Sequence, residues 1–222
     1  MSPSHPEAGD RLAASLHADL GDALAEIAAV LAVPVLLLAL TLLIACAYEL
    51  GRYVMELWRR DRRRRAHGSL TALAAAALAD PVSGHRLAAE AGGAFVGAAV
   101  ERIATAAASP EDLEHALTDY ELAVQRRLDR TRIIVRAGPA VGLMGTLIPL
   151  APGMEALGRG DVEALAGDLR IAFAATVIGL LAGTVAFALT LGRTRIYTED
   201  LTALERATEA ARAPSARPGA AR

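Results

Sequence analysis

Two threonines, each set among small residues, are the best candidates for chemistry in this sequence. Thr146 follows Gly138, Gly142 and Gly145, and Thr176 lies in a similar stretch further along the chain. A threonine hydroxyl donates and accepts hydrogen bonds, but it does not titrate near neutral pH. The pair could therefore orient water or relay a proton without storing one. The ordinary alternative is that each hydroxyl bonds to a carbonyl one turn back in its own helix.

Small residues at spacings of three and four lie on one helical face and let two backbones approach closely in lipid. The sequence predicts such helix-packing positions at Gly138, Gly142, Gly145, Gly179 and Gly183. Pro149 has no N–H to donate to the carbonyl of Gly145, so we expect a local kink and a free acceptor beside Thr146. Thr146, Thr176 and this carbonyl are predicted to form a narrow polar lining.

The stretches that must position these residues carry no charge. They are Ile27–Tyr48 with 22 residues, Ala137–Met154 with 18 and Ile171–Gly192 with 22, in a chain of 222 residues that is 54% hydrophobic and 22% charged. Each run is long enough, or nearly so, to cross about 30 Å of hydrocarbon as a helix. The sequence therefore predicts an all-α integral membrane protein with three transmembrane helices and long cytoplasmic helical extensions.

A basic cluster after the first run predicts the orientation. Its members are Arg59, Arg60, Arg62, Arg63, Arg64 and Arg65. Arginines beside a span mark the cytoplasmic side and attract anionic lipid. We interpret the cluster as a topology anchor in contact with membrane lipid, and we expect no nucleic-acid binding. The amino terminus is then outside, and the protein lies in the inner cell membrane with a cytoplasmic carboxyl terminus.

The predicted layout alternates spans with polar segments. A helix is expected to start with Ser109 as N-cap and Pro110 at its first position, and to continue into the second span because no proline follows until Pro139. The first span is expected to be uncleaved, and the tail from about residue 213 to be disordered. The segments are 1–26 external, 27–48 transmembrane, 49–132 cytoplasmic and helical, 133–154 transmembrane, 155–169 an external loop, 170–192 transmembrane and 193–222 a cytoplasmic tail.

Several soluble chemistries are excluded by composition. The chain has no lysine, so a P-loop lysine and a Schiff-base lysine are impossible. Its one cysteine, Cys46, cannot form an internal disulfide, and its five histidines lack ligand spacing. We expect no enzyme, no cofactor and no metal site.

The segments Ala137-Gly-Pro-Ala-Val-Gly-Leu-Met-Gly-Thr-Leu-Ile-Pro149 and Ala172-Phe-Ala-Ala-Thr-Val-Ile-Gly-Leu-Leu-Ala-Gly183 resemble the MotA/TolQ/ExbB proton channel family. Its members carry a Gly-Leu-x-Gly-Thr segment followed by a Thr-x-x-Gly-Leu segment. The three-span layout is similar to the TolQ and ExbB branch. Ile171 stands where that branch commonly has glutamate, and Pro149 stands where glycine is frequent, which indicates a divergent subgroup.

This resemblance implies a homo-oligomer, typically a pentamer, whose second and third spans enclose single-span partners of the MotB/TolR/ExbD type. The partner's membrane aspartate would carry the proton, and Thr146 and Thr176 match the family's pore threonines. The expected function is a proton-channel subunit of a motor that converts proton-motive force into mechanical work. A non-conducting membrane scaffold and a membrane subunit of a multicomponent transporter are the alternatives. Nothing in the residues selects protons over sodium.

Overall fold

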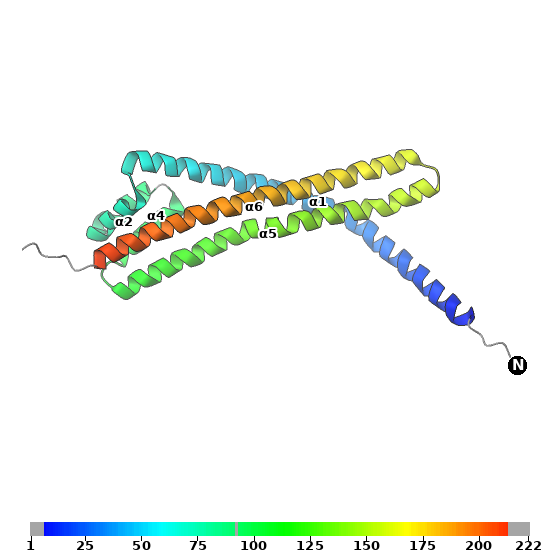
Figure 1. Cartoon of the computed structure of the whole chain (residues 1–222), viewed down its shortest axis with the longest axis horizontal. Coiled ribbons are helices and arrows are strands. Elements are labelled where there is room, and N and C mark those ends of the chain that lie inside the picture. Colours follow the sequence, from blue (N-terminus) through cyan, green and yellow to red (C-terminus); the bar gives the residue numbers. More distant parts are fainter. Residues whose placement is uncertain (1–6, 92, 213–222) are drawn as a thin grey trace, which may run out of the picture. The chain divides into compact units, whose positions relative to one another are not determined.

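The computed structural model describes residues 7–91 and 93–212, and every element within these ranges is a helix (Figure 1). The elements are α1 (Glu7–His67), α2 (Leu70–Ala79), the 3-10 helix η1 (Pro81–Ser83), α3 (Gly84–Glu90), α4 (Ala94–Thr105), α5 (Pro110–Gly158) and α6 (Val162–Arg212). Helices α1, α5 and α6 are long and apolar enough to cross a membrane. The predicted all-α fold with three candidate spans is confirmed.

Local signals explain where the helices begin and end. Helix α5 starts at Pro110, and the Ser109 hydroxyl accepts a hydrogen bond from the Asp112 N–H at 3.4 Å, as expected for an N-cap. Helix α1 ends at His67 because Gly68 takes the left-handed conformation at φ 77°, which glycine adopts without steric cost. The Ser69 hydroxyl then caps α2 by accepting from the Ala72 N–H at 3.2 Å.

The structure shows the secondary structure of two expected segments. The polar stretch before the first span is helical from Glu7 onward, so α1 starts well before its uncharged run. The range 155–169, expected as a loop, is helical except for residues 159–161. Gly160 supplies the turn with φ 78°, and the Asp161 carboxylate accepts from the Ala164 N–H at 3.0 Å to start α6. The tail expected to be disordered lies outside the described residues.

The chain divides into two compact units. Unit 1 comprises Met1–Cys46 and Ile134–Thr184, and unit 2 comprises Ala47–Ile133 and Val185–Arg222. Unit 1 holds the facing parts of α5 and α6, which run antiparallel on either side of the short turn (Figure 1). Unit 2 holds a hydrophobic core built from α2, α4, the start of α5 and the end of α6, including Leu73, Val100, Ile103 and Leu204.

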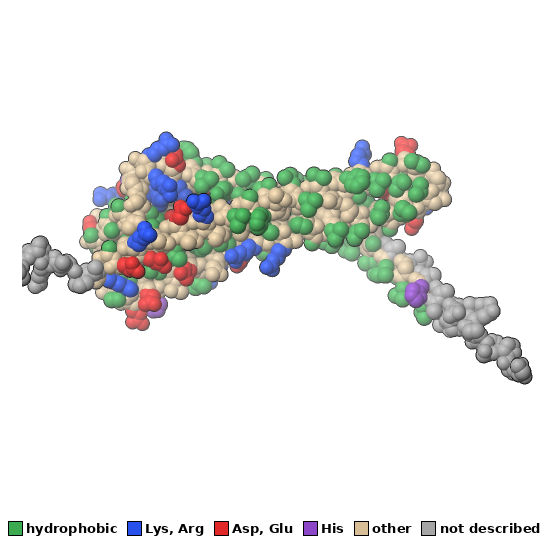
Figure 2. Space-filling model, viewed as in Figure 1, with side chains coloured by type: hydrophobic (Ala, Val, Ile, Leu, Met, Phe, Trp, Pro, Cys, Tyr) green, Lys and Arg blue, Asp and Glu red, His purple; other side chains and the backbone are tan. Residues whose placement is uncertain are grey.

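Charged side chains are distributed unevenly between the spans and the rest of the chain. In Figure 2 the arginines and carboxylates gather over unit 2, whereas the parts of α5 and α6 in unit 1 are covered mainly by apolar side chains. Exposed members of that apolar surface include Leu143, Leu147, Phe173 and Val177, which are 58–65% exposed. Such a surface is suited to lipid or to neighbouring protein rather than to water.

Candidate functional site

Helices α5 and α6 meet at glycines in unit 1. A Cβ placed on Gly179 would lie 2.5 Å from the Gly138 carbonyl oxygen and 2.7 Å from the Gly142 Cα. A Cβ on Gly145 would lie 2.5 Å from the Ala175 Cβ, and one on Gly183 would lie 2.9 Å from a carbon of the Pro139 ring. The structure thus brings all five predicted helix-packing glycines into one interface, where the backbones themselves are in contact.

Both candidate threonines lie beside this interface and are partly buried. The Thr176 hydroxyl is 3.3 Å from the Ala172 carbonyl of its own helix and 3.4 Å from the Gly142 carbonyl of α5. The Thr146 hydroxyl donates to the Leu143 carbonyl at 2.7 Å. Thr176 therefore offers its hydroxyl at the contact between the helices, whereas Thr146 bonds within its own helix.

The two hydroxyls share one side of the α5–α6 pair. Gly145 of α5 faces Ala175 of α6, and each candidate threonine is the next residue after its member of this contact. Successive residues in an α-helix are turned by about 100°. Because the two right-handed helices run antiparallel, these turns bring Thr146 and Thr176 to the same side.

Helix α1 contacts α6 on the other side. The Cys46 Sγ lies 3.5 Å from the Ala182 carbonyl oxygen. Ala182 follows the interface residue Gly179 by three positions, and Thr176 precedes it by three. At about 100° per residue, Ala182 and Thr176 therefore lie about 60° from Gly179 on opposite sides of it around the helix axis. The side of the pair that carries Thr146 and Thr176 is therefore away from this contact with α1.

Three prolines occur inside α5, namely Pro139, Pro149 and Pro152. Pro139 packs against Gly183, and Gly153 one turn after Pro149 approaches the Leu165 side chain of α6. Pro149 is partly buried, and its ring nitrogen cannot donate to the carbonyl of Gly145. The predicted pore kink and free acceptor at this position stay predictions.

The six arginines interpreted as a topology anchor have unequal surroundings in unit 2. Arg60 and Arg63 are buried, at 8% and 5% exposure. Arg60 forms a two-bond ion pair with Asp200, and the Arg63 Nη1 donates to the Ala91 carbonyl at 3.2 Å. The other four, Arg59, Arg62, Arg64 and Arg65, are exposed. Two members of the cluster are thus buried in protein contacts, while Arg64 and Arg65 form ion pairs at the surface with Glu199 and Asp61. The role of the cluster in topology stays a prediction.

Buried ion pairs join α1 to α6 in unit 2, and sequence reasoning missed them. The Arg193 Nη1 lies 2.7 Å from a Glu49 carboxylate oxygen, and the Arg193 side chain is fully buried. Arg60 and Asp200 form a second pair further along both helices. The residue numbers increase from the first pair to the second on both helices, so α1 and α6 run in the same direction in unit 2.

Two buried tyrosines extend these pairs. The Tyr120 hydroxyl donates to the Asp200 carboxylate at 3.4 Å, and the Tyr197 hydroxyl donates to Glu56 at 3.2 Å. Burial, with the nearby carboxylates, raises the pKa of both tyrosines well above the usual value. Arg127 lies 3.9 Å from Glu56. The hydroxyls therefore stay protonated and act as donors to the buried carboxylates.

A repeating pattern in α1 carried the signal for this network. Glu49, Tyr53, Glu56, Arg60 and Arg63 follow one another at spacings of four, three, four and three, which places them on one helical face. A helix face of charged and aromatic residues at this spacing is as typical of a polar interface buried against another helix as of a face exposed to water. No group of three or more His, Cys, Asp or Glu side chains that could hold a metal occurs among the described residues.

The fold and this site define a multi-pass membrane protein with three candidate spans, built around a close-packed pair of antiparallel helices. The model of the MotA/TolQ/ExbB proton channel family matches residues 88–205, which is more than half of the chain and includes both threonines and all five glycines. The chain therefore belongs to the MotA/TolQ/ExbB proton channel family, whose members are channels and not enzymes. Searches among curated proteins and among solved structures found no match.

Proposed function

We propose that this protein is the proton-channel subunit of an energy-transducing membrane motor, in a divergent three-span group similar to TolQ and ExbB. The observation that carries the proposal is the shared side of Thr146 and Thr176 at a glycine-lined helix contact. This side is away from the contact between α6 and α1, so it is suited to face a channel or a partner.

The proton carrier must come from another chain. No Asp or Glu occurs in Ala137–Met154 or in Ile171–Gly192. Threonine hydroxyls hydrogen-bond a carboxyl group or orient water, but they do not take up a proton near neutral pH. We infer that a single-span partner of the MotB/TolR/ExbD type supplies a membrane aspartate, and that Thr146 and Thr176 line its path.

The assembly that fits this role is a homo-oligomer, which we take to be a pentamer around the partner. Apolar side chains on the exposed surface of α5 and α6, among them Leu143 and Phe173, would then contact lipid or the neighbouring copies. We place the protein in the inner cell membrane with its amino terminus outside. The opposite directions of α5 and α6, and the common direction of α1 and α6 in unit 2, agree with a first span that runs inward, a second that runs outward and a third that runs inward.

A flux measurement on threonine variants tests the proposal. Thr176→Val and Thr146→Val keep the side-chain volume and remove only the hydroxyl. Purified protein with its partner in liposomes should lose most proton flux in either variant while the complex keeps its stoichiometry. Thr190→Val is the matched control, because the Thr190 hydroxyl bonds only to the Ala186 carbonyl of its own helix, at 2.8 Å. Equal flux in all three variants would contradict a pore role for the two threonines.

A non-conducting scaffold is the second candidate. The observation in its favour is that the Thr146 hydroxyl is already bonded to the Leu143 carbonyl, as in any packed membrane helix. A scaffold predicts no flux above that of empty liposomes, with or without Asp→Asn in the partner. The channel predicts flux that this partner change abolishes.

A further inference from the structure

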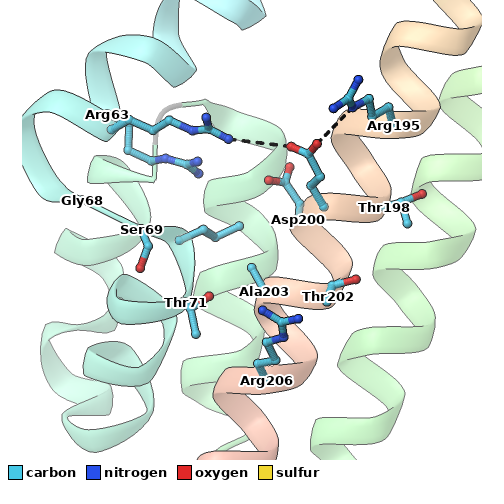
Figure 3. Close-up of a pocket in the computed structure, with 13 residues that line it drawn as sticks. Arg63, Gly68, Ser69, Thr71, Arg195, Thr198, Asp200, Thr202, Ala203 and Arg206 are labelled. Carbon is cyan, nitrogen blue, oxygen red and sulfur yellow. Dashed lines mark hydrogen bonds and ion pairs between the residues drawn. The ribbon is translucent and has the colours of Figure 1, made fainter.

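Unit 2 contains a pocket of about 800 Å³ beside the turn between α1 and α2 (Figure 3). Four arginines line it: Arg63 and Arg64 from α1, and Arg195 and Arg206 from α6. Ser69, Thr71, Thr198 and Thr202 belong to the same lining, and none of the residues that line it is aromatic. The pocket is thus rich in hydrogen-bond donors and in positive charge.

The carboxylates of the pocket do not balance this charge. Only Glu199 and Asp200 oppose the four arginines. Asp200 is already held by Arg60, which is outside the lining, and by the Tyr120 hydroxyl. Glu199 lies 3.3 Å from Arg195 and 3.7 Å from Arg64. The lining therefore carries an excess of positive charge even after its ion pairs are counted.

Two arginines have no carboxylate partner. Arg63 is 5% exposed, its Nη1 donates to the Ala91 carbonyl, and its Nε has no hydrogen-bond partner. Arg206 forms no hydrogen bond or ion pair within the described part of the chain. A buried guanidinium whose donors lack acceptors is unfavourable unless an anion approaches it. Arg63 of α1 and Arg206 of α6 thus bring two guanidinium groups without a carboxylate partner to the lining of one pocket (Figure 3).

The start of α2 adds further donors. Ser69 caps this helix, and Leu70 and Thr71, its first two residues, line the pocket. The first N–H groups of a helix have no partner within it and carry partial positive charge. An anion in the pocket would therefore meet backbone donors as well as arginine side chains.

We propose that this pocket binds a small phosphate-bearing anion. Phosphate groups suit the site because they carry up to two charges and accept several hydrogen bonds from guanidinium forks, hydroxyls and helix N-termini at once. Without aromatic side chains the pocket offers no stacking surface for a base, so recognition falls on the phosphate and on hydroxyls near it.

The source of the phosphate is a soluble molecule and not a lipid headgroup. Arg63 follows Tyr48, the last residue of the first uncharged run, by fifteen positions along α1. Fifteen residues of α-helix rise about 22 Å, which exceeds the depth of the headgroup layer. A phosphate attached to a lipid would not reach this pocket while the run lies in the hydrocarbon.

The test uses the full chain in nanodiscs of phosphatidylcholine, titrated with pyrophosphate and with inorganic phosphate by calorimetry at constant ionic strength. We expect saturable binding at one site. Arg206→Gln should weaken it at least about tenfold, because one charge-assisted interaction is lost. Arg130→Gln removes an equal charge from an exposed position outside the pocket and should leave the affinity unchanged. The absence of saturable binding, or equal weakening in both variants, would overturn the proposal.

A second variant and a second membrane complete the test. Thr71→Val should weaken binding about threefold to tenfold while the unfolding temperature stays near that of the wild type, since Thr71 lines the pocket and is not part of the hydrophobic core of unit 2. Nanodiscs containing phosphatidylglycerol should leave the pyrophosphate affinity unchanged. If they abolish binding, the headgroup occupies the site and the soluble source is wrong.

Discussion

Replacing Gly179 by alanine tests the packing of α5 against α6 most directly. The new Cβ would lie 2.5 Å from the Gly138 carbonyl oxygen, whereas ordinary contact begins at 3.4 Å, so the helices must separate by 3.4 − 2.5 = 0.9 Å. Both neighbours, Gly138 and Gly142, present backbone atoms there, and no side chain can rotate away. Overpacking of this kind costs about 1–3 kcal/mol.

The same change at Gly167 is the matched control. A Cβ on Gly167, also in α6, would meet nothing within 4 Å. Glycine to alanine in an unobstructed helix stabilises by about 0.5–1 kcal/mol. Gly167→Ala should stabilise by about 0.5–1 kcal/mol. Since Gly179→Ala has the same gain and in addition the overpacking cost, it should be less stable than Gly167→Ala by about 1–3 kcal/mol.

The assay is thermal unfolding of the purified full chain in detergent, followed by circular dichroism. For a chain of this size each kcal/mol shifts the unfolding temperature by about 2–4 °C, so Gly179→Ala should unfold roughly 2–12 °C below Gly167→Ala. An unchanged molecular mass of both variants in detergent separates a packing effect from a change in assembly. If Gly179→Ala unfolds at the same temperature as Gly167→Ala, α5 and α6 are not in close contact at Gly179. Thr146 and Thr176 then need not lie on one side of the helix pair.

Two further predictions concern unit 2. Arg193→Met leaves the Glu49 carboxylate buried without its partner at 2.7 Å and should lower the free energy of unfolding by about 3–5 kcal/mol. The double variant with Glu49→Leu should recover more than half of that loss in the same unfolding assay. If the losses of the two single variants add instead, the two residues are not paired. Hydrogen bonds from Ser83 hold the pKa of Asp80 in the folded state below its usual value. The ionised carboxylate therefore stabilises the folded state fully at a pH above the usual pKa, and this stabilisation is lost as the pH falls through the lower pKa of the folded state. The gap in unfolding temperature between wild type and Asp80→Asn should therefore narrow below about pH 4, and a gap that widens there would show that the sign is wrong.

Much of the helical layout could be predicted because its signals are local. Ser109 and Pro110 mark the start of α5, and the three uncharged runs mark the candidate spans. The glycines were found for the same reason, since a spacing of three and four is visible within one helix. The break at Gly68 was missed because a single glycine is ambiguous until its φ angle is known.

The polar face of α1 is such a local signal, but the residues that pair with it across the buried network could not be predicted in this way. Glu49 and Arg193 are 144 positions apart, and only the packing of α1 beside α6 pairs them. Arg60 and Arg63 belong to a basic cluster that is typical of a membrane boundary, so their burial was not visible in the sequence. For the candidate site, residue type and spacing suggested Thr146 and Thr176, but their shared side depends on which faces of α5 and α6 meet.

The ion pairs between α1 and α6 also limit how this part of the protein can move. Glu49 and Arg60 of α1 bind Arg193 and Asp200 of α6 at two separate levels. A slide of α1 by a single turn, about 5.4 Å, would break both pairs together and separate four buried charges from the partners they have on the other helix. Helix α1 is therefore unsuited to act as a piston against α6. Where these pairs form in unit 2, α1 and α6 are held in one register, and sliding between them requires both pairs to break.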